Sequence, residues 1–431
     1  MRQFIEISPD SSRQLKSNLL NYTRNVGVGA IMDGNDFTMP GFQKESVEFI
    51  AGIDKLHDYS MSLDGLEQFH SLHNDWLLGF LTYDLKNELE RLESNHDDDI
   101  ELPQFYFFVP RYLILFKNGK WMAGYNDDVD TEENLLGFIK DIEVESGVEE
   151  EFSDVKLLSK VSYSEYVGIV EKLQRHIRLG DVYEVNYCIE FFARRLDISP
   201  VQLYRKLNEV SPSPFSAFVK YHDKSLICAS PERYLKKEGS RLISQPIKGT
   251  SPRDADPEVD RANIEYLKNS EKERAENVMI TDLVRNDLSK VAKQGRVKVE
   301  ELCGVYSFRQ VHQMISTISA EMDERYSWVD AIKATFPMGS MTGAPKVNAM
   351  KLIERYEVTK RGLYSGSVGY VTPEGDFDFN VVIRSILYNR KKGYLSFMVG
   401  SAITALANPE SEYEECLVKA SAIMKVLNAE E

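Results

Sequence analysis

Hydrophobic residues recur at regular spacings in the second half of the chain. Between residues 166 and 177 they fall three or four positions apart and stop at Gly180, which predicts an amphipathic helix with a C-terminal cap. From Tyr183 to Phe191 apolar residues then alternate with polar ones such as Glu184 and Asn186, with the period of two that is typical of a strand. A helix followed directly by a strand is therefore predicted here.

Further strands and long helices are predicted after this pair. The strands cover residues 215–221, 226–229, 311–319 and 364–371, and the helices cover 270 to about 291, 344–356 and 409–427. Gly375 and Gly393 supply turns between the last strands, so much of the sheet should consist of antiparallel hairpins. Strands and helices grouped in this way predict an α+β fold.

The first 150 residues show a weaker pattern. Strand-like runs occupy residues 104–109 and 112–116, and polar stretches such as 94–99 lie between such runs. The composition turns acidic between residues 127 and 154, with three successive glutamates at 149–151, which predicts a solvated linker or a connecting helix rather than a site. We therefore divide the chain into a strand-rich N-terminal region with an acidic connector, residues 1–150, and a second unit, residues 151–431.

Composition and charge narrow the function. The 431 residues carry a net charge of −16, which argues against nucleic acid and anionic membranes as partners, because both need clustered cations. No apolar stretch reaches the length of a spanning helix or a signal peptide, so we expect a cytoplasmic protein. An anionic substrate would need a local cation or a metal ion. The cysteines lie far apart without a C-x-x-C pair, which predicts buried, reduced thiols at Cys188, Cys228, Cys303 and Cys416.

Two predicted helices each carry a pair of glutamates on one face. Glu273 and Glu276 lie three residues apart, as do Glu412 and Glu415. If both faces converge, their carboxylates suit Mg²⁺, which prefers a few carboxylates, several waters and a substrate oxygen. A purely structural alternative is also open, in which Ser270 and Glu273 form a capping box and Glu276 pairs with Lys272.

Three shorter features are ambiguous from the residues alone. The glycine-rich run 339–346 is either an anion cradle at the start of a helix or a tight turn, and it lacks the Gly-Lys-Ser/Thr of a Walker A loop. Lys248 has only uncharged neighbours, so it is either an exposed lysine or one that desolvation turns into a nucleophile. For Glu232 and Arg384 a surface ion pair is the ordinary interpretation.

Five stretches, taken together, resemble a known family. They are PIKGTSPR, EKERAENVMITDLVRNDL, FPMGSMTGAPK, RGLYSGSVGY and GSAITALANPESEYEE, in this order. They resemble the chorismate-utilising enzymes, which include anthranilate synthase component I and aminodeoxychorismate synthase component I, over about residues 160–431. The resemblance implies two packed, largely antiparallel β-sheets flanked by helices, with the active site in the cleft between them. Residues 151–431 would then form the chorismate-binding catalytic domain.

The resemblance also implies roles for individual residues. Glu276 and Glu415 would be Mg²⁺ ligands, and Glu273 and Glu412 would hold metal-bound water. The substrate-binding residues would be Arg384 and Tyr364, which hold the enolpyruvyl carboxylate, with Gly249, Thr250, Thr342, Gly343, Gly400, Ala402 and Lys419 around them.

One residue distinguishes branches of the family. Anthranilate synthases usually read P-I-A-G-T where this chain has P-I-K-G-T, the form of aminodeoxychorismate synthases. Lys248 would attack ring carbon C2, Glu232 would protonate the departing C4 hydroxyl, and ammonia would then attack C4 and expel the lysine. Isochorismate and salicylate synthases place a base lysine where this chain has Glu184. The resemblance thus implies synthesis of 4-amino-4-deoxychorismate for p-aminobenzoate and folate. An anthranilate synthase component I and a non-catalytic, chorismate-binding regulatory subunit are the alternatives.

One departure from the family and one absent motif also bear on the proposed reaction. The family often has a histidine where this chain has Gln313, and His312 lies one residue earlier on the opposite strand face, which argues against a role for His312. No Gly-x-Cys-x-Gly elbow of a glutaminase surrounds any cysteine. Ammonia would therefore come from solution or from a separate glutamine amidotransferase subunit.

Overall fold

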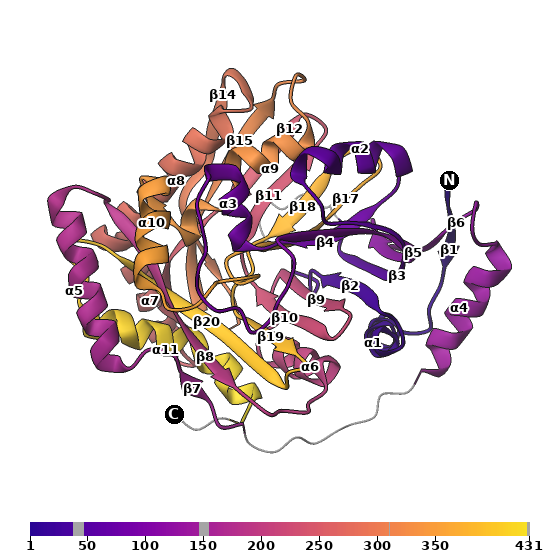
Figure 1. The fold of residues 1–431 in the computed structure, drawn as a ribbon, viewed down its shortest axis with the longest axis horizontal. Coiled ribbons are helices and arrows are strands. Elements are labelled where there is room, and N and C mark those ends of the chain that lie inside the picture. Colours follow the sequence, from indigo (N-terminus) through magenta and orange to yellow (C-terminus); the bar gives the residue numbers. More distant parts are fainter. Residues whose placement is uncertain (38–46, 146–154, 310, 429–431) are drawn as a thin grey trace.

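A single hydrogen-bonded sheet of 20 strands runs through the computed structural model, which describes residues 1–37, 47–145, 155–309 and 311–428. Every strand pairing among these residues is antiparallel. Helices lie around the sheet (Figure 1), so the predicted α+β class with a largely antiparallel sheet is confirmed. The acidic run 149–151 lies outside the described residues.

The sheet has two arms. The strands of the first arm are β1 (Arg2–Ile7), β2 (Val28–Asp33), β3 (Phe49–Tyr59), β5 (Phe105–Lys117), β6 (Lys120–Asn126), β7 (Leu158–Ser159), β8 (Glu184–Ala193), β9 (Phe215–Tyr221), β10 (Lys224–Ser230), β16 (Gly343–Ala344), β19 (Ser385–Asn389) and β20 (Tyr394–Ile403). The strands of the second arm are β4 (Leu77–Leu81), β11 (Arg233–Glu238), β12 (Arg241–Gln245), β13 (Ile247–Pro252), β14 (Ala292–Ser307), β15 (Val311–Met322), β17 (Ser367–Val371) and β18 (Phe377–Asn380).

Strand β5 joins the two arms. Its first residues pair with β4 of the second arm and its last residues pair with β6 of the first, while β3 follows it along its length. A buried cluster with members such as Ala30 and Val219 from the first arm and Phe80 and Tyr370 from the second fills the space between them. The two sheets expected from the resemblance are therefore two packed arms of one continuous sheet.

Strands from either side of residue 150 lie next to each other. Strand β2 pairs with β9, and β4 pairs with β17. The proposed division near residue 150 therefore separates stretches of sequence whose strands are hydrogen-bonded to one another.

Eleven α-helices and three 3₁₀ turns surround the sheet in the described part of the chain. They are α1 (Ser12–Tyr22), η1 (Thr23–Asn25), α2 (Leu63–His73), η2 (Tyr83–Leu85), α3 (Lys86–Glu90), α4 (Glu132–Val144), α5 (Tyr163–Leu179), α6 (Pro200–Val210), α7 (Pro257–Asn269), α8 (Glu271–Ser289), α9 (Trp328–Thr335), η3 (Gly339–Met341), α10 (Lys346–Tyr356) and α11 (Pro409–Val426). None of these helices is long and apolar enough to cross a membrane.

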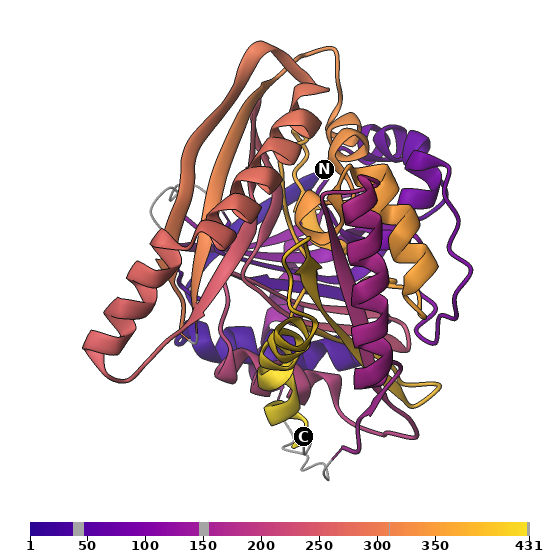
Figure 2. The ribbon, with the colours of Figure 1, turned by 90° about the vertical axis from the view of Figure 1, so that its left-hand side faces the viewer.

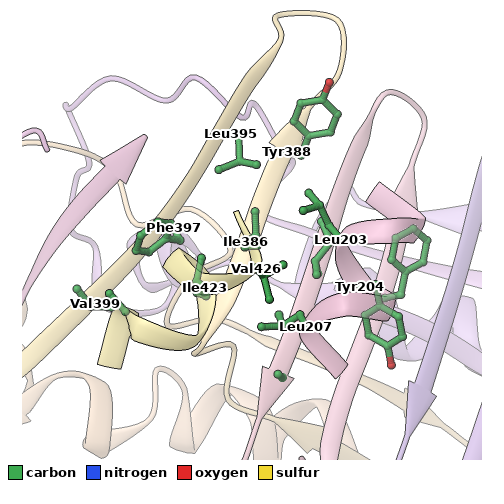
Figure 3. Close-up of a cluster of buried hydrophobic side chains, with 14 of the residues drawn as sticks. Leu203, Tyr204, Leu207, Ile386, Tyr388, Leu395, Phe397, Val399, Ile423 and Val426 are labelled. Carbon is green, nitrogen blue, oxygen red and sulfur yellow. The ribbon is translucent and has the colours of Figure 1, made fainter. Parts of the chain in front are cut away.

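Two of the helices matter for the site, and each is held by an apolar face. Helix α8 lies beside β14 and β15 (Figure 2), and its buried Ile280, Val284 and Leu288 belong to the cluster that includes Ile318 of β15. Helix α11 packs on β20 and next to α6 (Figure 3). Figure 3 labels ten members of a buried hydrophobic cluster, which are Leu203, Tyr204, Leu207, Ile386, Tyr388, Leu395, Phe397, Val399, Ile423 and Val426. Both helices therefore present their remaining faces in fixed positions.

The local predictions are largely confirmed, with two corrections. The runs 104–109 and 112–116 form the single strand β5, and the ladder shifts register between Lys55 and His57, close to Lys55's partner Pro110, which has no N–H to donate. Strand β17 begins at Ser367, three residues later than predicted, because Ser365 takes a left-handed conformation with φ 61°. Tyr364 therefore lies in the turn before the strand.

Candidate active site

A cavity of about 470 Å³ lies between the two arms. Strands β13 and β15 line it from the second arm, β20 lines it from the first, and helices α8 and α11 contribute further side chains. The volume falls within the range of small-molecule sites, roughly 300–1,000 Å³. The predicted site residues on the cavity are Glu232, Lys248, Gly249, Thr250, Glu273, Glu276, Tyr364, Arg384, Gly400, Ala402, Glu412, Glu415 and Lys419. The structure thus brings together residues that are up to 187 positions apart in the sequence, from 232 to 419.

The structure does not place Thr342 and Gly343 on the cavity. The Thr342 hydroxyl is fully buried and donates to the carbonyls of Met338 and Gly339, each at 3.3 Å. Gly343 pairs with Val185 of β8, and a Cβ at this position would lie 2.1 Å from the carbonyl oxygen of Glu184. In the run 339–346 a 3₁₀ turn and the short strand β16 lead into α10, and Ser340 and Met341 are the residues of this run that line the cavity.

The paired glutamates face the cavity from two helices. Ser270 caps α8 by accepting from the N–H of Glu273, but no return bond of a capping box is recorded among the described residues. Lys272 pairs with Glu412 of α11 at 3.1 Å rather than with Glu276 on its own helix. Among the described residues, the structure therefore records neither the complete capping box nor the Lys272–Glu276 pair.

Burial is the largest single effect on the pKa of each of these four glutamates. It raises the pKa of Glu276 to about 8 and also raises the pKa of Glu273 and Glu412, because a desolvated carboxylate is costly. For Glu415 burial is also the largest single effect, but Lys419, Lys272 and Lys248 together outweigh it and lower the pKa. A cation among these side chains would relieve the cost of their charges.

The donor set suits Mg²⁺. Glu276 is 8% exposed and its Oε1 atom has no hydrogen-bond partner among the described residues, so a buried acceptor is left over. No three acidic, histidine or cysteine side chains in the described ranges are gathered closely enough to form a metal cluster by themselves. Mg²⁺ does not require such a cluster, since waters and substrate oxygens usually complete its shell. The site suits Mg²⁺ because it offers carboxylate oxygens, one of which, Oε1 of Glu276, has no hydrogen-bond partner among the described residues.

Lys248 lies on a β-bulge of β13. Between Ile247 and Thr250 this strand has one residue more than β15 opposite, and Gly249 takes φ 97° within that bulge. Asn277 of α8 is 2% exposed and donates to the carbonyls of Lys248 and Met314, each at 3.1 Å. Asn277 thus holds the bulge that carries the lysine. The sequence analysis missed this role, although Asn277 directly follows Glu276 in one of the five stretches.

The structure places Lys248 in a buried ion pair, a contact that neither interpretation from sequence included. Its side chain is only 10% exposed, and its Nζ lies 2.9 Å from Oε1 of Glu184, whose side chain is 1% exposed. Burial alone would lower the pKa of Lys248, as predicted, but the charges of Glu184, Glu276 and Glu415 outweigh it and raise the pKa. The lysine is therefore not an exposed side chain, and the neighbouring carboxylates favour its ammonium form.

Glu232 is a buried acid at the cavity rather than a surface ion-pair partner. It is 3% exposed, accepts from the Ser340 hydroxyl at 2.7 Å and accepts from the Ile247 N–H at 3.4 Å. Burial raises its pKa to about 7, against the opposing effect of these hydrogen bonds. A carboxyl group with such a pKa can donate a proton near neutral pH.

Arg384 is an unpaired cation in the cavity. No hydrogen bond or ion pair to its guanidinium is recorded among the described residues, and burial lowers its pKa. Its backbone is left-handed, with φ 51°, in the loop between β18 and β19. An unpaired guanidinium in a cavity is suited to a ligand carboxylate.

The two residues at the start of β15 behave as the strand alternation predicts. Gln313 lines the cavity, is 3% exposed, and its Oε1 atom has no partner among the described residues. His312 points away from the cavity: its Nδ1 lies 2.8 Å from the Ser307 hydroxyl and its Nε2 lies 2.9 Å from Asp260 of α7. His312 therefore joins α7 to the β14–β15 hairpin.

Comparisons with known proteins agree with this geometry. The sequence model of a family described as chorismate binding enzyme matches residues 32–425. Aminodeoxychorismate synthase component 1 of Bacillus subtilis is 34% identical over 381 residues, which cover 82% of this chain and 77% of the relative. Anthranilate synthase component 1 of Thermus thermophilus is 34% identical over 362 residues, with 82% and 78% covered. The crystal structure of anthranilate synthase component I from Streptococcus pneumoniae matches the fold with a TM-score of 0.73 at 23% identity, over 99% of this chain and 92% of that one.

The family match spans most of the chain, and relatives above 30% identity cover more than two thirds of it. The protein belongs to the chorismate binding enzyme family.

Proposed function

We propose that the chain is the synthase component of an aminodeoxychorismate synthase, which converts chorismate and ammonia to 4-amino-4-deoxychorismate, a precursor of p-aminobenzoate and folate. The observation that carries this proposal is the placement of Lys248. Lys248 lies on a bulge at the cavity, near the glutamates of α8 and α11 and near the buried acid Glu232.

The charges of the cavity support a substrate with two carboxylates. Glu276 and Glu415 would hold Mg²⁺, with Glu273 and Glu412 on its water ligands, and the ion supplies a positive charge to the ring carboxylate of chorismate. Arg384 and Tyr364 would bind the enolpyruvyl carboxylate. Gly249, Thr250, Gly400, Ala402 and Lys419 line the remaining wall.

The residues of the chain would then carry the covalent chemistry. The Lys248 amine forms a bond to ring carbon C2, the two ring double bonds shift, and the C4–O bond breaks. Glu232 in its acid form gives its proton to the departing hydroxyl, which leaves as water. Ammonia next attacks C4, the double bonds shift back, and the lysine leaves as an amine.

Ammonia would come from a separate glutamine amidotransferase subunit or from solution. All four cysteines are buried, and none carries the sequence elbow of a glutaminase nucleophile. The isolated chain should therefore use ammonium salts and remain inactive with glutamine alone. Turnover of glutamine by the pure chain would contradict this assignment.

Product identification tests the proposal directly. The pure chain is incubated with chorismate, Mg²⁺ and ammonium, and the product is identified by mass and fluorescence. We expect aminodeoxychorismate, whereas fluorescent anthranilate would support the second candidate, to which relatives such as the Thermus thermophilus enzyme point.

Two Lys248 variants separate a nucleophile from a charge partner. Lys248→Ala and Lys248→Arg should both lose aminodeoxychorismate formation while keeping chorismate binding, because arginine retains the charge but cannot act as a neutral amine. Substantial product from Lys248→Arg, together with no chorismate adduct on the parent chain, would refute the covalent route.

A further inference from the structure

Glu184 and Lys248 form a buried pair that the proposed reaction does not yet use. Glu184 is the first residue of β8, and its Oε1 lies 2.9 Å from the lysine Nζ. Apart from this ion pair, neither oxygen of Glu184 has a hydrogen-bond partner among the described residues. Among the described residues, Lys248 is therefore the recorded partner of this carboxylate.

Burial makes the charged form of such a pair expensive. A carboxylate and an ammonium group both lose hydration in the interior, and their attraction offsets this loss only in part. If the proton moves from nitrogen to oxygen, the pair becomes a neutral amine and a neutral carboxylic acid, and the desolvation cost of both charges is removed. A ligand that fills the cavity and displaces water favours this neutral form further.

The other acids near Lys248 are differently placed. Glu276 on α8, Glu415 on α11 and Glu232 in the β10–β11 turn all act on it through their charge. Glu415 is paired with Lys419 at 2.6 Å, and Glu232 is hydrogen-bonded to the Ser340 hydroxyl. In the described part of the chain, Glu184 is the acid recorded within hydrogen-bond distance of Nζ.

We propose that Glu184 accepts the proton of Lys248 and so generates the nucleophilic amine without exchange of that proton with solvent. This inference rests on the covalent route proposed above. In the first step the N–H bond of the ammonium group breaks, the proton binds the Glu184 carboxylate, and the nitrogen lone pair forms the bond to C2. When ammonia attacks C4 and the lysine is expelled as an amine, Glu184 returns the proton and the ion pair is restored.

The pH dependence of adduct formation tests this role. The full chain is mixed with chorismate and saturating Mg²⁺ without ammonium, and the chorismate adduct on Lys248 is followed by intact mass. Saturating Mg²⁺ suppresses competition between protons and the metal at Glu273, Glu276, Glu412 and Glu415. The parent chain should show a flat rate on the acid side, because the proton stays within the pair, and a decrease above about pH 7 as Glu232 loses its proton.

Glu184→Gln is the decisive variant. The amide cannot accept the proton, which must then leave for solvent, so at pH 7 adduct formation should slow by at least about tenfold. An acid limb should also appear, in which the rate increases by about tenfold per pH unit. Glu184→Asp keeps a carboxylate and should keep the flat acid side at a lower rate. Chorismate titrations followed by fluorescence should give similar affinities for all three proteins.

The outcomes distinguish the two proposals. Absence of any adduct on the parent chain overturns the covalent route. An adduct on the parent chain with the same pH profile in Glu184→Gln overturns the role of Glu184 alone. If Glu184→Gln does not fold, the Asp variant decides: an acid limb in its profile contradicts the proton transfer, and a flat acid side supports it.

Discussion

The two ends of the cavity solve the problem of buried charge in different ways. At the α8–α11 end four glutamates share the space with Lys272 and Lys419, and these lysines already pair with Glu412 and Glu415. At the other end the Arg384 guanidinium has no partner among the described residues.

This difference gives the cavity a direction. The carboxylate end keeps an excess of negative charge, which suits a divalent cation and, through it, one carboxylate of the ligand. The Arg384 end keeps a single positive charge, which suits a second carboxylate directly. A dianion such as chorismate would therefore bind in one orientation, with one carboxylate toward the glutamates and the other toward Arg384.

The largest expected effect comes from neutralising the carboxylate end. Glu276→Gln and Glu415→Gln should each lower turnover at saturating Mg²⁺ by about a thousandfold, since a metal ion supplies several kcal/mol of charge stabilisation. Mn²⁺ affinity, measured by electron paramagnetic resonance, should fall in parallel. The exposed Glu414 lies on the same helix, so Glu414→Gln serves as the matched control. If both cavity variants bind Mn²⁺ with the affinity of the parent chain, Glu276 and Glu415 are not the metal ligands.

The Arg384 end should give a smaller effect on binding. A hydrogen bond to a charged group contributes about 1.5–3 kcal/mol, so Arg384→Met should raise the KM for chorismate by about 10- to 100-fold. Arg384→Lys keeps the charge but loses the bidentate fork, and it should recover only part of this loss. The KM for ammonium is the internal control and should not change. An unaltered chorismate KM in Arg384→Met would show that this end does not bind a carboxylate.

Glu232 should set the pH above which the reaction rate decreases. The pKa of Glu232 is raised to about 7, so its proton-donating form dominates below this pH and is lost as the pH rises through it. At a constant concentration of free NH₃, the rate should decrease by about tenfold per pH unit above 7. Glu232→Gln should have a low rate without this limb. An alkaline limb that persists in the Gln variant would belong to another group.

The smallest effect is expected at the bulge that carries Lys248. Asn277→Ala removes two hydrogen bonds to buried carbonyls and should lower the free energy of unfolding by about 1–3 kcal/mol in urea titrations. It should also slow adduct formation at Lys248 more than it weakens chorismate binding. Equal losses in both would mean that Asn277 only stabilises the fold.

The sequence predicted the secondary structure well wherever one element has one clear periodicity. Helix α5 and strand β8 follow the spacings read from residues 166–177 and 183–191, and Gly180 is the C-cap of α5 as expected. The prediction failed where the extent of a strand depends on its pairing with a distant strand. The runs on either side of Pro110 appear separate in sequence, but β3 holds them in one ladder.

The candidate site shows the same limit at the level of side chains. The types of residue and the five stretches were sufficient to find the charged residues that line the cavity, apart from Lys272. They could not reveal that Glu184 faces Lys248, because 64 positions separate the two and the contact depends on the placement of β8 against β13. Lys272 was assigned a partner on its own helix, whereas the fold offers Glu412 from another. A local sequence pattern cannot show whether a charged residue pairs with a residue on its own helix or with one on a distant element.

The missing side chain at Gly343 sets the position of the proposed proton acceptor. Its Cα packs so closely on the carbonyl of Glu184 that even a methyl group would displace the first residue of β8. The carboxylate that faces Lys248 is thus held in place by a close backbone contact with a residue that does not line the cavity. Chemistry at the cavity therefore depends on a position behind its wall that has no room for a side chain.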